Sequence, residues 1–357
     1  MPSSRFYGYA EAPRFSFVSI GDDCRGDKPQ TCFCFAIVSN GRYKTAMEQN
    51  SDTFTTAPLR LASRASQLAL CQAELVRSKL GPIASEIVPI TTIGDKVLDR
   101  SLADAGGKGL FIKELEKSIL VGESEAAIHS MKDMETHFAP GTEIAAVLAR
   151  EDRRDALLGG YATLDDLPAG AIVGTSSVRR RALLLHHRPD VSVKLLRGNI
   201  NRRIKLLEEG QYDAIILAVA GLKRLDLKVP YSPIDPQVMP TAAAQGALAV
   251  QVAAPVDNRS HAVRAAFAGM NCATTLAEVT AERAVLAHLD GSCHTPIAAS
   301  AVCGDDGQLH LDAMILRPDG EAAHRRQHNG PIENAAMLGE ELGAALLDDA
   351  GGREFLA

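Results

Sequence analysis

The chain has 357 residues and a mass of 38.0 kDa, more than one compact core usually holds, which predicts two or three domains. Its hydrophobic content of 46% and charged content of 23% are ordinary for a globular chain and exclude global disorder. The net charge of −6 argues against a protein that coats nucleic acid, and no apolar run approaches the ~20 residues of a membrane span.

The charge is unevenly distributed along the chain. Between Ser176 and Lys205, nine Lys and Arg residues accompany a single Asp, a local charge of +8 that leaves −14 for the remainder. An acidic protein that gathers its cations in one stretch is more typical of binding a small anionic ligand than a polyanion. Seven cysteines, an odd number, do not indicate a disulfide framework and favour a reducing, cytoplasmic setting.

Residues 1–56 show no sustained periodicity and no signal-peptide pattern, so we expect a disordered extension there. Cys32 and Cys34 are too few ligands to predict a metal site, and translation could instead begin at Met47.

From Pro58 onward, strands and helices alternate regularly, which predicts a mostly parallel α/β sheet. The expected strands are 59–62, 87–91 and 126–129, and the expected helices are 66–80 and 111–120.

The alternation then restarts as βαβαβ and predicts a second α/β domain. Its expected strands are 171–173, 191–196 and 213–220, with helices at 178–187 and 200–209.

After Asp257 the pattern becomes a strand meander with helices. We expect helices at 276–289 and 333–348 and strands at 297–303, 309–316 and 321–327. The fold class is therefore α/β, with two α/β domains and a small α+β C-terminal domain. The expected domains are 57–150 with about 245–266, then 151–244, then 270–357.

The strongest local signal is Gly174-Thr175-Ser176-Ser177, a turn from a strand into a helix. Small hydroxyl residues cap the free N–H groups there, and the helix dipole favours an anion. Further arginines follow this turn and the next strand, and the carboxyl ends of strands converge on one crevice, so these arginines could share a ligand. They are Arg179, Arg180, Arg197 and Arg203. The alternative is a capped helix with a solvated basic face.

A second signal is His129-Ser130-Met131-Lys132-Asp133, which ends a buried strand. In a crevice, the Asp133 carboxylate could hold a proton for a leaving group or stabilise a developing cation. The alternatives are an ordinary surface ion pair and a Schiff base on Lys132, although no pyridoxal-phosphate motif accompanies that lysine.

Two loops complete the candidate site. The glycine-rich segment 106–109 lacks the spacing of a nucleotide-binding loop, and a flexible lid or a substrate clamp fits it better. Cys293 lies among Gly, Ser and Pro residues, which favours an exposed, reactive thiol over a small buried hydrophobe. A Cys–His protease with His294 is disfavoured because sequence neighbours rarely have nucleophile–base geometry.

From about Leu59 to the C-terminus, the chain resembles the porphobilinogen deaminase family, also called hydroxymethylbilane synthase. The resemblance rests on motifs in the right order: residues 60–66 (RLASRAS), 94–95 (GD), 106–111 (GGKGLF), 129–133 (HSMKD), 174–180 (GTSSVRR), 196–199 (LRGN), 218–225 (AVAGLKRL) and the Cys293 loop.

The resemblance implies an enzyme of tetrapyrrole (haem) biosynthesis. Members join four porphobilinogen molecules head to tail with loss of ammonia and release linear hydroxymethylbilane. They carry a covalent dipyrromethane cofactor on a cysteine, by a thioether, and here Cys293 matches that position. The implied fold has two domains like periplasmic binding proteins and a third that carries the cofactor. The implied protein is a cytoplasmic monomer whose partner is porphobilinogen, with no nucleic acid, membrane or metal.

The resemblance also implies roles for individual residues. Asp133 matches the catalytic carboxylate, which assists loss of ammonia and stabilises the resulting cation. Lys108 and Phe111 belong to the clamp loop. Positions that match contacts to cofactor or substrate are Arg64, Ser66, Lys132, Thr175, Ser177, Arg179, Arg180, Arg197, Arg203 and Arg224.

Four residues depart from the family pattern. Asp104 stands where Lys is frequent, Ala244 replaces a more usual Gly before Gln245, and Ser292 and His294 flank Cys293 where Gly and Gln are common. The competing class is a solute-binding protein for an anionic ligand, which would need neither Cys293 nor Asp133.

Overall fold

The computed structural model describes residues 57–92, 94, 109, 112–291 and 295–356. The expectation for residues 1–56 therefore lies outside the described residues. So do the expectations for Asp104, Lys108, Phe111, Ser292, Cys293 and His294.

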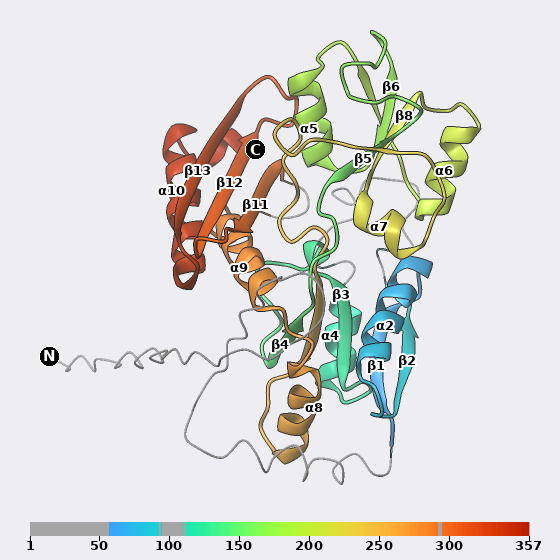
Figure 1. Ribbon diagram of the computed structural model, residues 1–357, viewed down its shortest axis with the longest axis vertical. Helices are drawn as coiled ribbons and strands as arrows, with labels where there is room; N and C mark the ends of the chain where they lie inside the picture. The colour runs from blue at the N-terminus through green and yellow to red at the C-terminus, as the bar shows by residue number, and fades with distance from the viewer. Residues whose placement is uncertain (1–56, 93, 95–108, 110–111, 292–294, 357) are drawn as a thin grey trace, which may run out of the picture. The chain divides into compact units, whose positions relative to one another are not determined.

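The first sheet has five strands in the order β2-β1-β3-β10-β4 (Figure 1). β1 is parallel to β2 and β3, whereas β10 is antiparallel to both β3 and β4. The strands are β1 (Leu59–Arg64), β2 (Ser85–Ile90), β3 (Ala126–Ser130), β4 (Thr142–Val147) and β10 (Leu248–Ala253).

Helices cover both faces of this sheet. On one face, Val76 of α2 (Gln67–Lys79) and Phe267 of α8 (Asn258–Ala268) pack with the core residue Leu61. On the other, Leu115 of α4 (Lys113–Leu120) packs with Ala62. Alternate residues of β1 thus serve the two cores, as the two-residue period of a strand requires.

The second sheet has the order β7-β6-β8-β5-β9, in which β6 is parallel to β7 and β8, and β5 is antiparallel to β8 and β9. Helix α5 lies on one face, and α6 and α7 lie on the other. The elements are β5 (Asp155–Leu158), β6 (Ile172–Thr175), β7 (Ser192–Leu195), β8 (Ala214–Ala218), β9 (Ser232–Pro233), α5 (Val178–His187), α6 (Ile200–Glu208) and α7 (Val219–Arg224).

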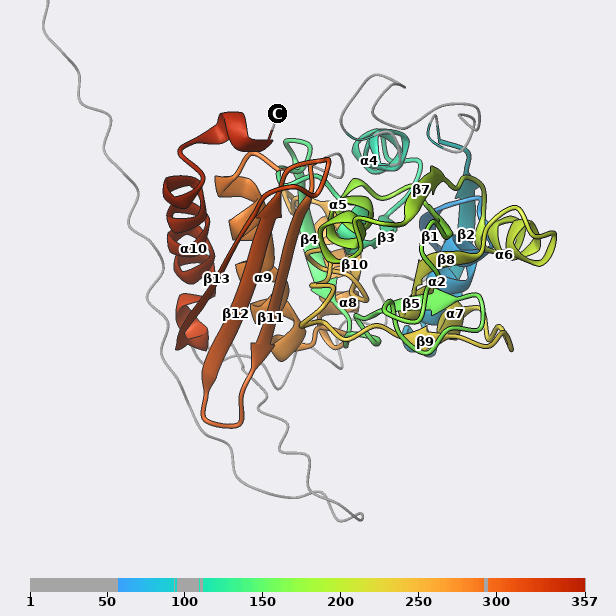
Figure 2. The same cartoon turned by 90° about the horizontal axis from the view of Figure 1, so that it is seen from above.

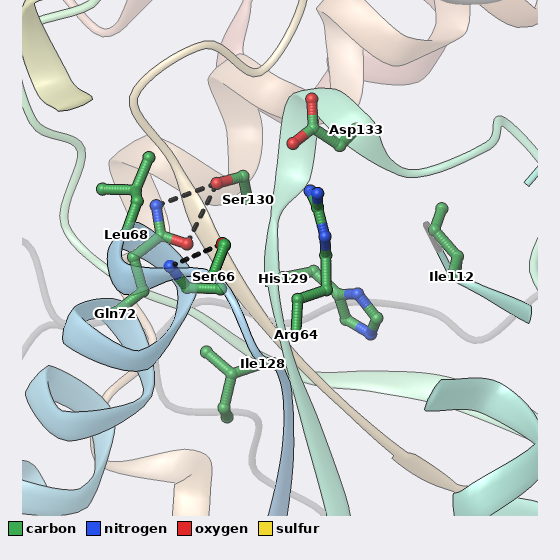
Figure 3. Close-up of a pocket in the computed structure, with 10 residues that line it drawn as sticks. Arg64, Ser66, Leu68, Gln72, Ile112, Ile128, His129, Ser130 and Asp133 are labelled. Atoms are coloured by element: carbon green, nitrogen blue, oxygen red, sulfur yellow. Dashed lines mark hydrogen bonds between the residues drawn. The ribbon is translucent and has the colours of Figure 1, made fainter. Parts of the chain in front are cut away.

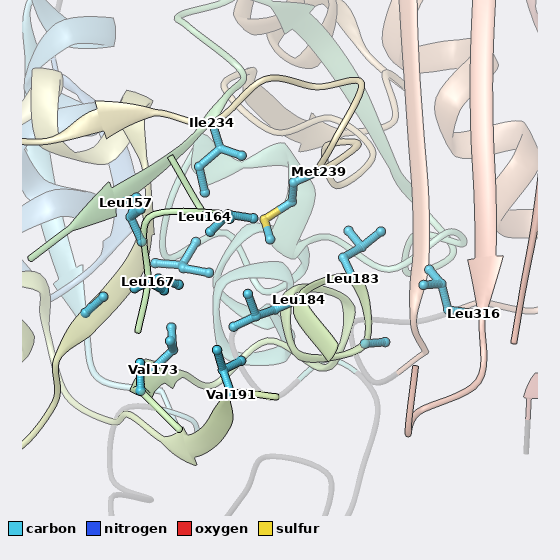
Figure 4. Close-up of a cluster of buried hydrophobic side chains, with 14 of the residues drawn as sticks. Leu157, Leu164, Leu167, Val173, Leu183, Leu184, Val191, Ile234, Met239 and Leu316 are labelled. Carbon is cyan, nitrogen blue, oxygen red and sulfur yellow. The ribbon is translucent and has the colours of Figure 1, made fainter. Parts of the chain in front are cut away.

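The third sheet is an antiparallel meander, β11 (Ile297–Cys303), β12 (Gln308–Leu316) and β13 (Ala323–Pro331). Helices α9 (Ala273–His288) and α10 (Ala335–Asp349) pack on one face (Figure 2). The other face adds Leu316 to the core around Leu157, Leu184 and Met239 of the second sheet (Figure 4).

The fold class expected from the sequence is confirmed, with two α/β sheets and an α+β unit. The expectation of a mostly parallel first sheet is confirmed, because β10 alone among its five strands runs against the others, and β5 is the corresponding strand of the second sheet. The predicted strand 213–220 stops at Ala218, since Val219 begins α7. The domain boundaries stay a prediction. None of the helices in the described ranges is both long and apolar enough to cross a membrane.

Candidate active site

A small pocket, partly open to solvent, lies where β1 and β3 end and α2 begins. Ser66 caps α2 by accepting a hydrogen bond from the Ala69 N–H at 3.4 Å. The guanidinium of Arg64 points toward the end of the pocket where Asp133 lies (Figure 3). The structure thus brings together Arg64, Ser66 and Asp133, three residues that the sequence singled out.

Sequence reasoning assigned no role to two further polar residues of this pocket, Gln72 and Ser130. Gln72 and Ser130 exchange hydrogen bonds, at 2.9 Å from Gln72 Nε2 to Ser130 Oγ and 3.1 Å from Ser130 Oγ to Gln72 Oε1. Gln72 lies on the buried face of α2 beside Ala69 and Ala73. The sequence feature that could have identified Gln72 is a polar side chain on an otherwise apolar helix face.

His129 lines the same pocket and is buried. Burial, with a smaller contribution from the charge of Arg64, lowers its pKa to about 4, although a hydrogen bond with Gln251 partly opposes this shift. The imidazole is therefore neutral at physiological pH. It adds no positive charge to a site that already holds several cations.

Asp133 is exposed at the end of a short 3₁₀ turn, Met131–Asp133, whereas the neighbouring Lys132 is half-buried. Lys132 Nζ donates to Gln245 Oε1 at 3.1 Å. Burial, together with the charge of Arg180, lowers the pKa of Lys132 to about 8, a shift that Asp133 partly opposes. These charges therefore lie close enough to act on one another.

The turn after β6 has the predicted capping geometry. Thr175 Oγ1 accepts from the Ser177 N–H at 3.2 Å, and Ser177 Oγ accepts from the Arg180 N–H at 3.4 Å. The hydroxyls therefore begin α5, as the sequence indicated.

Arg179 and Arg180 are buried, and both bind the carboxylate of Asp155. Arg179 Nη2 lies 2.6 Å from Oδ2, and Arg180 Nη2 lies 2.7 Å from Oδ1. Although burial raises the pKa of Asp155, the two guanidiniums hold it far below its usual range. From the sequence, we expected a bound ligand to supply the negative charge that balances these arginines. In the structure, the protein itself supplies a negative charge for Arg179 and Arg180. Sequence reasoning did not identify Asp155 as a site residue. The feature that could have pointed to it is a carboxylate at the start of an otherwise apolar strand, β5.

The remaining arginines come from the second sheet. Arg203 on α6 donates from Nε to Gly198 O at 2.8 Å, and Arg224 at the end of α7 donates from Nη2 to Gly246 O at 2.6 Å. Burial, together with the charges of Arg180 and Arg197, lowers the pKa of Arg203 to about 10, and Asp133 opposes this shift. Asp133 of the first sheet therefore interacts with the cations of the second sheet.

Gln245 connects the two groups of charges. Its Nε2 donates to Asp155 Oδ1 and to the Arg153 carbonyl, both at 2.7 Å, while its Oε1 accepts from Lys132. The segment with Ala244 and Gln245 therefore joins the turn that holds Asp133 to the buried carboxylate of Asp155 in the second sheet.

The chemistry of this site fits an anionic ligand. Burial and the charges of Arg180 and Arg197 lower the pKa of Arg203, so added carboxylates would relieve a repulsion among these cations. A cofactor bearing carboxylates is compatible with these donors. Within the described ranges, no group of His, Cys, Asp and Glu side chains could hold a metal ion.

Two family models match the chain. Residues 59–261 match the description "Porphobilinogen deaminase, dipyromethane cofactor binding domain", and residues 276–348 match "Porphobilinogen deaminase, C-terminal domain".

Several solved structures also show a likeness. The periplasmic VFT2 domain of BvgS from Bordetella pertussis is 13% identical, with a TM-score of 0.34 over 59% of this chain and 86% of that domain. An ancestral cationic amino acid solute binding protein is 10% identical, with a TM-score of 0.35 over 62% and 93% of the two chains. A TRAP periplasmic solute binding protein from Desulfovibrio salexigens is 11% identical, with a TM-score of 0.35 over 60% and 74%.

Proposed function

The chain belongs to the porphobilinogen deaminase family, and we propose that it condenses four porphobilinogen molecules head to tail, with loss of ammonia, into linear hydroxymethylbilane. Family membership makes it a transferase of tetrapyrrole biosynthesis with a dipyrromethane cofactor. The observation that carries the specific reaction is an exposed carboxylate, Asp133, among the cations Lys132, Arg180 and Arg203.

The proposed role of Asp133 follows from the charge that develops. As the aminomethyl group of porphobilinogen departs as ammonia, positive charge grows on the pyrrole, and a fixed carboxylate nearby stabilises it. The dipyrromethane, when bound through Cys293, supplies the pyrrole carbon that attacks. Asp133 is two residues beyond the buried Met131, whose N–H donates to Ala247 O at 3.0 Å, so a short, fixed turn holds the carboxylate.

The cations of the site serve substrate recognition in this proposal. Each pyrrole ring carries an acetate and a propionate, so every addition brings two negative charges. Arg64 and Lys132 would bind these carboxylates from the first sheet, and Arg197, Arg203 and Arg224 from the second. The hydroxyls of Ser66, Thr175 and Ser177 would add neutral hydrogen bonds.

Arg179 and Arg180 remain proposed binding residues, and we assign them a second role in addition to binding. Arg179 Nη1 donates to Pro240 O at 2.6 Å and Arg180 Nη1 to Ile216 O at 3.0 Å, besides their bonds to Asp155. Because these bonds fix both guanidiniums, we propose that they also set the positive potential of the site. Lys108 and Phe111 stay proposed clamp residues, and a cytoplasmic monomer stays a prediction.

The mass of the purified protein tests this function. It should exceed the sequence mass by one dipyrromethane unit, and Cys293→Ala should abolish the excess together with turnover. Cys303→Ala, which alters a half-buried thiol outside the site, is the matched control and should keep both. Active protein with an unmodified mass contradicts the proposal. A solute-binding protein would bind porphobilinogen without ammonia release.

A further inference from the structure

Helix α9 is tied to the segment that follows Asp133. The guanidinium of Arg283, on α9, donates to three successive carbonyl oxygens: Met134 at 3.4 Å, Glu135 at 2.5 Å and Thr136 at 3.2 Å. Its Cζ lies 5.0 Å from the centroid of the Phe138 ring, in cation–π geometry. A single side chain therefore fixes the backbone immediately after the proposed catalytic carboxylate.

The carboxylate of Glu135 extends this tie to the start of α4. Its Oε1 accepts from the Gly109 N–H at 2.6 Å, and the Gly109 carbonyl accepts from the N–H groups of Ile112 and Lys113 at 3.0 and 3.2 Å. Gly109 has a φ of +78°, a left-handed conformation that glycine adopts without strain. Glu135 thus holds the backbone turn from which α4 begins.

The same turn contributes a wall of the pocket. Ile112 is buried and lines the pocket together with Arg64 and Asp133, on the side away from Gln72 (Figure 3). A shift of Glu135 would therefore move Ile112 as well as the segment next to Asp133.

Electrostatics joins the two residues into one unit. Burial lowers the pKa of Arg283 to about 10, and the charge of Glu135 opposes that shift. Arg283 is accordingly charged at neutral pH, and Glu135 is the acidic group that offsets its burial. Along the chain, Arg283 lies ten residues before Cys293.

We propose that Arg283 and Glu135 form a pair of positioning residues that set the Asp133 turn and the Ile112 wall relative to helix α9. This inference rests on the proposed function, because it assigns the pair to the reaction of Asp133. Neither residue is a catalytic residue, since both act through the backbone and Ile112. Displacement of a positioned carboxylate by about 1 Å costs on the order of 100-fold in rate, so the effect should appear in kcat rather than KM.

The test compares variants of the holoenzyme, loaded with cofactor as checked by intact mass. Arg283→Met should lower kcat by roughly 10- to 100-fold and Glu135→Ala by about tenfold, with KM within about threefold of wild type. Glu135→Gln should retain most of the activity because an amide oxygen still accepts from Gly109. The control is Arg326→Met, which removes an exposed ion pair with Asp349 on the third sheet and should leave kcat unchanged.

Amide hydrogen exchange gives a readout that does not depend on activity. Arg283→Met should speed exchange in peptides covering 131–139, and Glu135→Ala should also speed it in peptides that begin at Gly109. The double variant should lose no more kcat than Arg283→Met alone, because the pair acts as one unit.

The proposal that Arg283 and Glu135 act as a positioning pair would be refuted by unchanged kcat or unchanged amide exchange in the single variants. An additive loss of kcat in the double variant would also refute it. Wild-type protein without cofactor mass or turnover would instead refute the proposed function. The exchange pattern would still report on the tie between α9 and residues 134–136.

Discussion

Arg150 and Glu282 form a bidentate ion pair in which both side chains are buried. The distances are 2.8 Å from Nη1 to Oε1 and 3.0 Å from Nη2 to Oε2. Glu282, on α9, also accepts the N–H groups of Ala244 at 2.6 Å and Ala301 at 2.8 Å. One carboxylate therefore connects the segment between β4 and β5, the segment before β10, and β11.

Glu282→Ala should destabilise the protein strongly. Removal of one partner leaves Arg150 buried with less compensation, which typically costs about 3–5 kcal/mol. The denaturant midpoint of the holoenzyme measures the change. Asp349→Ala, at the exposed ion pair with Arg326, is the control and should leave the midpoint unchanged. Equal midpoints for Glu282→Ala and wild type would show that the network does not stabilise the fold.

Ala244 is a buried alanine with a φ of 58°, in the left-handed region. A side chain there costs roughly 1–2 kcal/mol, while glycine adds about 0.5–1 kcal/mol of unfolded-state entropy, so Ala244→Gly should raise stability by up to about 1 kcal/mol. Ala243→Gly, next to it without a positive φ, should lower stability instead. Thermal unfolding of both variants compares them directly, and a lower midpoint for Ala244→Gly would contradict the strain argument.

The sequence was sufficient to predict the fold class and the local geometry of the site where the signal is local. The strand-to-helix turn at Thr175 and Ser177 could be read because capping depends on neighbouring residues. The helix 178–187 was predicted with its observed bounds for the same reason.

Long-range pairing left weaker signals in the sequence. β10 was not predicted as a strand because Leu248–Ala253 is almost entirely buried and has no alternation, and its pairing with β3 and β4 joins residues about 100 apart along the chain. The binding of Arg179 and Arg180 by Asp155 was hidden likewise, since nothing local links Asp155 to α5. The cation cluster could be predicted, whereas its internal counter-ion could not.

Asp133→Asn should nearly abolish turnover while it preserves the fold and the cofactor. The variant keeps the size of the side chain but removes the charge that stabilises the developing cation, so kcat should fall by about 100-fold or more. Intact mass should still show the dipyrromethane. Asp190→Asn, which removes an exposed partner of Arg188, is the matched control. Unchanged turnover would exclude Asp133 from the mechanism.

Acid stability should depend on His129. Its pKa is about 4 in the folded protein and about 6.5 when unfolded, so below pH 6.5 the unfolded state binds the proton more readily. The stability from a neutral His129 is complete above pH 6.5 and is lost as the pH falls through 4. The loss is at most about 3 kcal/mol. His129→Gln should make the unfolding midpoint nearly independent of pH between pH 6.5 and 4. If the midpoint of the variant falls with pH as steeply as that of the wild type, His129 is not the cause of the acid destabilisation.

Lys132 predicts an alkaline limit on substrate binding. Its pKa of about 8 in the folded protein means that the ammonium loses its proton as the pH rises through 8, and its attraction for a carboxylate disappears with the charge. The KM for porphobilinogen should therefore rise between pH 8 and 9.5. The free energy of unfolding should instead rise over this range, because the folded protein then no longer buries a charged lysine. This gain in stability is complete only near the unfolded pKa of 10.5.

Lys132→Arg separates charge from general alkaline effects, since a guanidinium stays protonated throughout this range. The variant should keep KM flat to pH 9.5 even where its absolute value differs from wild type. Lys223→Arg is the matched control, because Lys223 lies in an exposed ion pair with Glu151, and it should keep the wild-type pH profile. If Lys132→Arg and wild type show the same rise in KM, another group limits binding, and the positive charge of Lys132 has no part in recognising the substrate's carboxylates.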